Sequence, residues 1–214
     1  MPEWEELHKK MWARKPDAIF EKFAKDYLKP GMRILDLGCG KGRHTVYCAQ
    51  MGLEVHGVDS SDTALEILRK KADEDQLFEL VKVTKADMGN LPYPDSYFDA
   101  VVTVNAVNHG YWKDVKKYFL EATRVLKSGG LLFVLCAPLE FLEDTSKPET
   151  KELERGTFIN IETMDGDVPH HLFTLEEMRE LMGDYDIIVL GTFRRYSDFM
   201  KREVNRMEAI GRKR

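Results

Sequence analysis

The stretch that most constrains this chain is RILDLGCGKGRHT, residues 33–45, where an apolar run containing Asp36 leads into three glycines within five residues. Gly38, Gly40 and Gly42 permit a positive φ and let a ligand approach the backbone closely, because they carry no Cβ. The stretch therefore predicts a strand that ends in a ligand-binding turn.

Short β-branched runs alternate with longer amphipathic runs along the chain, which predicts alternating strands and helices. Such a repeat implies right-handed crossovers and a mostly parallel sheet with helices on both faces, and ligands bind at the carboxyl ends of its strands. The predicted strands are 32–37, 54–59, 79–85, 98–105, 131–137, 185–190 and 204–213. The predicted helices after the first strand are 42–51, 61–73, 113–127 and 175–182.

The composition restricts the classes of protein to which the chain can belong. With 214 residues, 43% of them hydrophobic, the chain suits one α/β domain, so we expect residues 1–214 to form a single domain. A net charge of −5 disfavours a nucleic-acid partner. Cys39, Cys48 and Cys136 show no metal or disulfide spacing, and no segment approaches the roughly 20 apolar residues of a membrane span. We therefore expect a cytoplasmic protein without a membrane partner, and leave its oligomeric state open.

Two segments depart from the strand–helix repeat. Residues 1–29 hold two helical patterns, predicted to form a lid or a packing layer over one sheet edge. Residues 139–169 show no clear periodicity and are too long for a simple connection, which predicts an insertion on the substrate side.

Two reagents are commonly held by a glycine turn of this kind, a dinucleotide and S-adenosylmethionine. In a dinucleotide site, a third glycine in G-x-G-x-x-G allows close helix packing and the helix N-terminus receives a pyrophosphate. Here Arg43 occupies that third position, and Asp36 would meet a pyrophosphate with like charge. S-adenosylmethionine carries no phosphate, and its ammonium group suits a carboxylate at Asp36, directly or through water. The charges therefore favour S-adenosylmethionine.

Acidic residues also end or follow the next two predicted strands. Asp59 is placed to accept hydrogen bonds from both ribose hydroxyls, a role common to both reagents. Asp87 follows the third strand, and the neighbouring Met88 can lie flat on a purine. Together with Asp36, these residues predict a nucleoside site at one edge of the sheet.

These segments resemble the class I S-adenosylmethionine-dependent methyltransferases, from Arg33 to Ala137. The stretches GRHTVYCAQMG and HHLFTLEEMREL are similar to a small-molecule subgroup that includes tellurite-resistance-type and thiol enzymes. The resemblance implies a Rossmann-like fold, an α/β doubly wound seven-stranded sheet whose last strand is antiparallel. The cofactor-binding residues it implies are Asp36, Gly38, Cys39, Gly40, Gly42, Asp59, Ser60, Asp87, Met88 and Asn105.

The residues that follow the fourth predicted strand indicate which side chains lie near the methyl acceptor. Histidine titrates near neutrality in general, so His109 is a candidate general base, with orientation of the substrate as the alternative. The stretch 162–171 mixes carboxylates with imidazoles, but its glycine and proline indicate a turn, so we predict no metal. The predicted substrate-side residues are Trp12, Tyr111, Trp112, His170 and His171.

We therefore expect an enzyme that transfers a methyl group from S-adenosylmethionine to a small-molecule acceptor by in-line displacement, leaving S-adenosylhomocysteine. A general base is needed only for an acceptor that must lose a proton. Two alternatives stay open. One is a nicotinamide-dependent oxidoreductase, which Asp36 and Arg43 oppose, and the other is a regulatory protein that binds S-adenosylmethionine without turnover.

Overall fold

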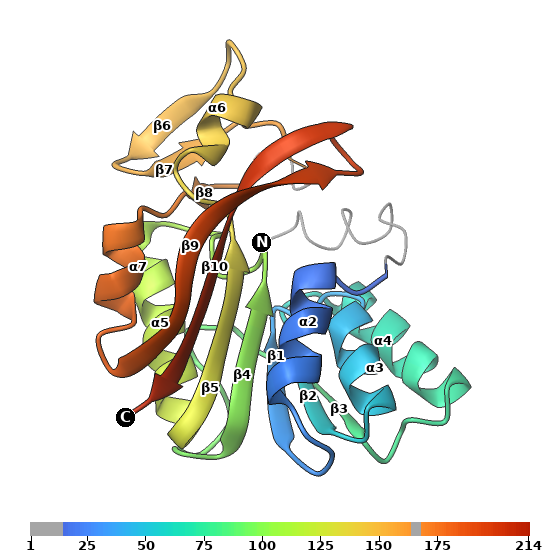
Figure 1. Cartoon of the computed structure of the whole chain (residues 1–214). Helices are drawn as coiled ribbons and strands as arrows, with labels where there is room; N and C mark the ends of the chain where they lie inside the picture. The colour runs from blue at the N-terminus through green and yellow to red at the C-terminus, as the bar shows by residue number, and fades with distance from the viewer. Residues whose placement is uncertain (1–14, 164–167) are drawn as a thin grey trace.

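Seven strands form one sheet in the computed structural model, which describes residues 15–163 and 168–214 (Figure 1). The strands are β1 (Arg33–Leu37), β2 (Glu54–Asp59), β3 (Val81–Lys85), β4 (Phe98–Val104), β5 (Leu126–Cys136), β9 (Tyr185–Ser197) and β10 (Arg202–Lys213). Their order is β3-β2-β1-β4-β5-β10-β9. Strands β1 to β5 pair in parallel, whereas β10 runs antiparallel to both β5 and β9. The predicted mostly parallel sheet with an antiparallel last strand is confirmed.

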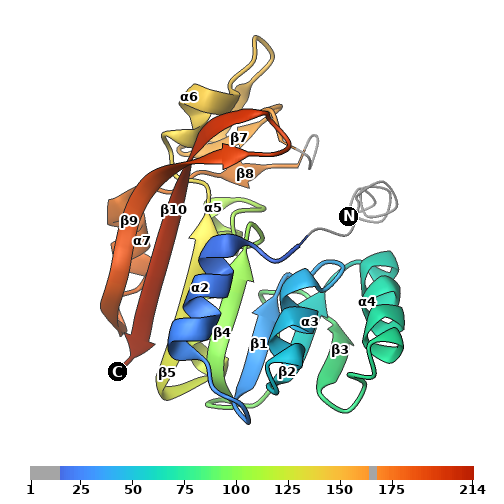
Figure 2. The same cartoon turned by 45° about the vertical axis from the view of Figure 1, so that its right-hand side comes forward.

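Helices cover both faces of this sheet (Figure 2). They are α2 (Ala18–Tyr27), α3 (Arg43–Gln50), α4 (Asp62–Glu74), α5 (Trp112–Val125) and α7 (Leu175–Leu181). Successive residues of a strand point to opposite faces. Ile34 accordingly packs in one buried cluster with α2, α3 and α4, while its neighbour Leu35 packs in a second cluster with α5 and α7. This two-sided burial explains why β1 reads as a continuous apolar run.

Helix α2 is the second of the two helices predicted within residues 1–29. Its Phe23 ring lies 4.5 Å from the ring of Phe133, and its Phe20 ring lies 5.7 Å from the same ring. Phe133 belongs to β5, an interior strand, so the expectation that this helix packs over one sheet edge is wrong. The first predicted helix, with Trp12, lies outside the described residues.

Strands β5 and β9 depart furthest from their predicted bounds. Strand β5 begins at Leu126 instead of residue 131, because the chain passes directly from α5 into the sheet. Strand β9 continues to Ser197 instead of residue 190, because it pairs with β10 along an antiparallel hairpin that ends at the Ser197–Arg202 pair. The hairpin extends past β5 and bends over the carboxyl-terminal end of the sheet (Figures 1 and 2).

The predicted insertion at residues 139–169 contains regular structure. It forms α6 (Phe141–Thr145), β6 (Lys151–Glu154) and β7 (Thr157–Ile159), and the next strand is β8 (His170–His171). Strands β6, β7 and β8 make a small antiparallel sheet. A third buried cluster joins this sheet and α6 to the hairpin, through Phe141, Phe158, Ile161, Leu172, Met200 and Val204. The insertion thus lies beside the hairpin (Figure 1).

Membrane-spanning helices were sought in the part of the chain that the structure describes. Within it, none of the helices combines the length and the apolar character needed to cross a bilayer.

Replacing Gly38 by alanine should destabilise the fold more than replacing Gly129, although both have a positive φ, +73° and +77°. A Cβ at Gly38 would lie 2.3 Å from the Cβ of Ala106, whereas a Cβ at Gly129 would meet nothing within 4 Å. The left-handed backbone costs about 1–2 kcal/mol at either site. Overpacking adds about 1–3 kcal/mol at Gly38. Urea unfolding of both variants measures the difference, and equal losses would contradict the packing role of Gly38.

Candidate functional site

A cavity of about 550 Å³ opens at the carboxyl ends of the parallel strands. One side, which we call the strand-end half, is formed by Gly38, Cys39, Gly40, Gly42, Asp59, Ser60, Asp87, Met88 and Asn105. The other side, the hairpin half, is formed by Ala137, Phe141, Glu162, Thr163, His170, Ser197, Phe199, Met200 and Arg206. Asn108 and His109 also line the cavity. The structure therefore brings together most of the predicted site residues.

The glycine turn after β1 is anchored to the end of β2. The N–H groups of Gly38 and Cys39 both donate to the carbonyl of Val58, each at 2.9 Å, and the N–H of Gly40 donates to Asp59 Oδ2 at 2.9 Å. A Cβ at Gly42 would lie 2.1 Å from Leu68 of α4. The glycines are thus required by packing within the protein, in addition to any close approach of a ligand.

Asp59 closes β2 with its carboxylate held by two backbone groups. Its Oδ2 accepts the N–H of Gly40 and its Oδ1 accepts the N–H of Ser61 at 2.9 Å. Each carboxylate oxygen has two acceptor sites, so both oxygens retain capacity for a ligand hydroxyl. Ser60, the next residue, also lines the cavity.

Asp36 lies beneath the turn instead of on the cavity wall. Its side chain is buried, and the hydroxyl of Thr45 donates to Asp36 Oδ2 at 2.6 Å. Burial raises the pKa of Asp36 to about 6, an effect opposed by the Thr45 hydrogen bond and by the charge of Arg43. Of the two predicted modes, direct contact with a ligand ammonium does not fit this position. Asp36 acts on the turn through Thr45 of α3.

Asp87, Met88 and Asn105 occupy the ends of the neighbouring strands, as predicted. Asp87 Oδ1 accepts the N–H of Gly89 at 2.7 Å, which fixes the loop after β3. Asn105 has a φ of +52°, an uncommon conformation for a residue other than glycine, and its N–H donates to the Leu135 carbonyl at 2.8 Å. Strained backbone of this kind gathers at functional sites.

Two histidines meet where the two halves of the cavity join. The rings of His109 and His170 are 4.9 Å apart and nearly perpendicular. His170 is buried, and its Nδ1 lies 2.6 Å from the carbonyl oxygen of Val168. Because a carbonyl oxygen only accepts, Nδ1 donates to it. His109 and His170 both line the cavity.

Three predicted substrate-side residues lie elsewhere. Tyr111 is exposed and caps α5, which begins at Trp112. The Trp112 ring stacks on the His171 ring at 4.8 Å, while the backbone N–H of Trp112 donates to Glu154 Oε1 at 2.6 Å. The helix start thus turns both aromatic residues away from the strand ends, so the prediction that Tyr111, Trp112 and His171 wall the cavity is corrected. Trp12 lies outside the described residues.

His44 is a cavity residue that the sequence reading missed. It lies on the first turn of α3, and its Nε2 accepts the N–H of Asp17 at 3.3 Å. Burial and the charge of Arg43 lower the pKa of His44 to about 3, so the ring is neutral. The sequence signal that could have indicated His44 is its position within GRHT, directly after the glycine turn.

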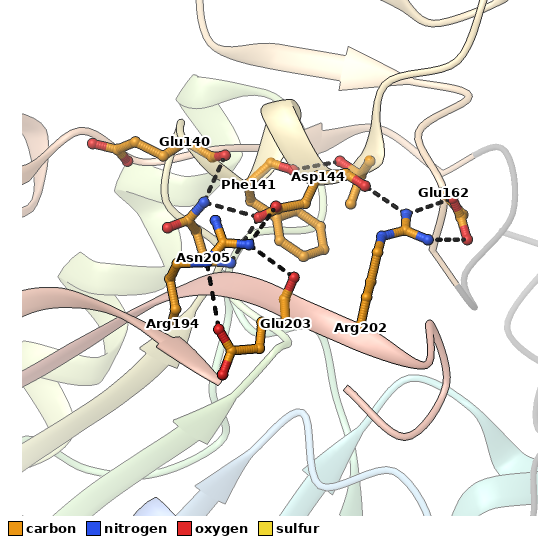
Figure 3. Close-up of polar contacts among 9 residues, drawn as sticks. Glu140, Phe141, Asp144, Glu162, Arg194, Arg202, Glu203 and Asn205 are labelled. Atoms are coloured by element: carbon orange, nitrogen blue, oxygen red, sulfur yellow. Dashed lines mark hydrogen bonds and ion pairs between the residues drawn. The ribbon is translucent and has the colours of Figure 1, made fainter. Parts of the chain in front are cut away.

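Apart from His170 and the predicted substrate-side insertion, the sequence did not indicate the hairpin half. A carboxylate whose side chain is 9% exposed organises this half. Asp144 of α6 accepts the N–H and the side-chain Nδ2 of Asn205, both at 2.8 Å, and Arg194 Nη2 at 3.2 Å (Figure 3). Arg202 donates to the Asp144 carbonyl at 2.5 Å and binds Glu162 at 2.7 Å. These contacts hold α6 and Glu162 against the hairpin, although the partners are up to 61 residues apart in sequence.

A metal site was sought among the same residues. In residues 15–163 and 168–214, no three or more His, Cys, Asp and Glu side chains are grouped so as to hold a metal ion. Asp165 and Asp167, which belong to the mixed stretch considered above, fall outside these ranges.

Part of the chain is similar to known proteins. Residues 35–134 match the family model for a methyltransferase domain, Methyltransf_11. The sterol 24-C-methyltransferase erg6 of Aspergillus fumigatus is 30% identical over 140 residues, which cover 65% of this chain and 36% of that protein. The chain thus spans about a third of that relative's length.

Solved structures show the same fold. A SAM-dependent methyltransferase from Methanosarcina mazei superposes with a TM-score of 0.75 at 22% identity, covering 94% of this chain and 99% of the other. The 1,6-didemethyltoxoflavin-N1-methyltransferase of Burkholderia thailandensis, solved with S-adenosylhomocysteine, gives 0.70 at 16% identity, covering 92% and 77%. Residues 35–134 thus match a methyltransferase-domain family, and the sheet has the fold of solved S-adenosylmethionine-dependent methyltransferases.

The buried Asp36 should make stability depend on pH in a way that Asp36→Asn removes. The folded pKa of about 6 exceeds the ordinary value of 3.8, so between these values the folded state binds more protons than the unfolded state. The stabilising effect of the protonated group is complete below about pH 4 and is lost as the pH rises through about 6, at roughly 1.4 kcal/mol for each pKa unit. Urea unfolding from pH 4 to 7 should show this loss relative to Asp36→Asn.

The exposed carboxylate of Asp26 provides the control for that comparison. Asp26→Asn should follow the wild-type pH dependence, because its side chain lies on the surface of α2. Parallel pH profiles for the wild type and Asp36→Asn would show that burial does not perturb Asp36.

Proposed function

We propose that this chain transfers a methyl group from S-adenosylmethionine to a small-molecule acceptor. The observation that carries the proposal is one cavity with two chemically different halves. The strand-end half presents the carboxylates of Asp59 and Asp87, and the hairpin half presents apolar side chains and Arg206. His109, Asn108 and Asn105 line the same cavity. The net charge of −5 supports an acceptor other than a nucleic acid.

The strand-end half fits the cofactor of this family. In the proposal, Asp59 and Ser60 hold the ribose, and Asp87 and Met88 hold the adenine. Two acceptor-rich carboxylates on the wall suit hydroxyl and amino donors of a nucleoside and would repel a pyrophosphate. The remaining predicted residues shape the methionine end, with Asp36 acting from below the turn, and they are Gly38, Cys39, Gly40, Gly42 and Asn105.

Methyl transfer depends mainly on aligning the acceptor with the methyl group and the sulfur of the cofactor. When bound, S-adenosylmethionine supplies a methyl group on a sulfonium that is a good leaving group. Holding two reactants in near-attack geometry contributes roughly 7–11 kcal/mol. The rigid strand ends orient one reactant, and the hairpin, α6 and His170 confine the other.

The three cysteines are buried free thiols, which supports a cytoplasmic setting.

S-adenosylhomocysteine should bind and stabilise the protein, and NAD should not, because a ligand that binds only the folded state raises stability by mass action. Asp59→Asn should weaken S-adenosylhomocysteine binding about tenfold to a hundredfold, since hydrogen bonds to a charged group contribute about 1.5–3 kcal/mol. Calorimetry measures both. The matched control is Asp62→Asn, an exposed carboxylate on α4 that is absent from the cavity wall.

Each alternative has a distinct outcome in these measurements. Binding of NAD alone would replace the proposal with a nicotinamide oxidoreductase. Cofactor binding without transfer of a labelled methyl group to any of a broad set of small molecules would favour the regulatory protein. An unchanged affinity in Asp59→Asn would remove Asp59 from the cofactor site.

His109 is proposed to orient the acceptor instead of removing its proton. With an acceptor found by methyl labelling, His109→Gln should raise the acceptor KM and leave the single-turnover rate at saturation within about tenfold, because glutamine keeps a hydrogen-bonding group. A general base contributes about 10²–10⁴-fold. A rate loss of that size, with loss of the acid limb from the pH–rate profile, would make His109 the base.

A further inference from the structure

The backbone on either side of His109 is bound to the chain at β8. The His171 N–H donates to the Asn108 carbonyl at 2.7 Å, and the Gly110 N–H donates to the Pro169 carbonyl at 2.9 Å. Pro169 directly precedes β8, and His171 ends it. The place of the His109 ring in the cavity therefore depends on where this strand lies.

The same segment is held again at the start of α5. The backbone N–H of Trp112 donates to Glu154 Oε1 of β6 at 2.6 Å. A negative charge is favourable at this point, because the N-terminus of a helix carries a partial positive charge. Glu154 is exposed, however, so water competes for its carboxylate oxygens. A second contact with the protein is what limits the Glu154 carboxylate to one orientation.

Thr157 of β7 provides this second contact. Its hydroxyl oxygen lies 3.2 Å from Glu154 Oε1 and 3.0 Å from His171 Nδ1, and both Thr157 and His171 are buried. A hydroxyl has one proton and a carboxylate only accepts, so Thr157 donates to Glu154. The Thr157 oxygen can then only accept from the ring, and His171 Nδ1 carries a proton.

The surroundings of the His171 ring keep it in this orientation. The ring stacks on Trp112 at 4.8 Å and meets the Phe173 ring edge-on at 5.1 Å. Its Nε2 lies 3.7 Å from Glu177 Oε2, beyond hydrogen-bond distance, and makes no hydrogen bond among the described residues. Burial lowers the pKa of His171, an effect that the charges of Glu177 and Glu154 oppose. At neutral pH the ring is therefore neutral, with Nδ1–H as its donor.

We propose that His171 and Thr157 are positioning residues for the acceptor side of the cavity. The His171 Nδ1–H orients the Thr157 hydroxyl, which orients the Glu154 carboxylate. Glu154 in turn fixes the start of α5, so that the preceding segment presents His109 to the acceptor. The inference rests on the proposed function and adds residues that do not line the cavity. It gives His171, wrongly predicted as a wall residue, an indirect part in the site.

The position of the proton is tested first, on the wild type near neutral pH. NMR of the protein with histidine labelled at nitrogen should show His171 with a protonated Nδ1 and an unprotonated Nε2. The ring contacts with Trp112 and Phe173 assign these signals, so that no variant is needed. A proton on Nε2 alone would break the series of hydrogen bonds at its first member and would overturn the inference.

Two variants of Thr157 then separate its hydrogen bonds from its packing. Thr157→Val keeps the shape and removes the hydroxyl, whereas Thr157→Ser keeps the hydroxyl. The NMR signals of His109 should move in Thr157→Val and stay in place in Thr157→Ser. With an acceptor found by methyl labelling, Thr157→Val should raise the acceptor KM about threefold to tenfold, the effect of one lost hydrogen bond. Thr157→Ser should restore the KM, and kcat and S-adenosylhomocysteine affinity should change little in either variant.

Thr150 provides the matched control within the same insertion. Its hydroxyl accepts the Lys147 N–H at 2.7 Å and donates to the Asn160 carbonyl at 3.0 Å, and it does not line the cavity. Thr150→Val therefore loses comparable hydrogen bonds without a connection to Glu154. It should leave the His109 signals and the acceptor KM unchanged.

Three results with the variants would overturn the inference. One is an unchanged set of His109 signals in Thr157→Val, and another is an equal effect of Thr150→Val. The third is a loss in Thr157→Ser as large as that in Thr157→Val, which would assign the effect to packing. If Thr157→Val does not fold, the proton position of His171 still decides. Failure of the wild type to bind S-adenosylhomocysteine would instead count against the proposed function, because none of the NMR measurements requires that ligand.

Discussion

The attachment of the glycine turn to the ends of β2 and β4 holds the strand-end half of the cavity together. The N–H groups of Gly38 and Gly40 reach Val58 and Asp59, while the bare Cα of Gly38 packs where a Cβ would collide with Ala106. Three strand ends are thereby fixed at contact distance by one short segment. Because Asp59 is part of this attachment and faces the cavity, the same contacts that stabilise the sheet edge also orient a carboxylate toward a ligand.

The hairpin half depends on contacts between segments far apart in the chain. Asp144 joins α6 to Asn205 and Arg194, and Arg195 of β9 binds Asp17 at the start of α2 at 2.6 Å. Asp17 in turn donates its N–H to His44 on the cavity wall. The β9–β10 hairpin is therefore fastened at two places, on the insertion and on α2. It bends over the carboxyl-terminal end of the sheet (Figure 2), and Ser197, Phe199, Met200 and Arg206 from it line the cavity.

The strand-end half depends on local contacts and the hairpin half on long-range contacts. This difference explains which parts of the cavity could be predicted from the sequence. The turn, its flanking strand and helix, Asp59 and Asp87 form a local pattern, so the seven-stranded sheet and the positions of these strand-end residues could be predicted. Phe141 and Arg206 share a site only through the pairing of β10 with β5 and β9 and through the packing of α6, which periodicity along the chain does not encode. The predicted directions of the Tyr111 and Trp112 side chains are wrong for a related reason. The start of α5, one residue earlier than predicted, and the Glu154 contact from β6 decide where those side chains point.

The two halves also differ in how firmly they are tied to the fold. Residues of the turn are buried within the sheet's own packing, where overpacking costs about 1–3 kcal/mol. The Arg202–Glu162 pair is exposed at 42% and 40%, and exposed pairs typically contribute about 0–1 kcal/mol. Changes in the hairpin half can therefore alter which molecule fits beside Phe141 while leaving the sheet and the strand-end half intact. Asp144, with a side chain only 9% exposed and three donors around it, is the exception, since its loss would take the acceptor from the backbone N–H of the half-buried Asn205.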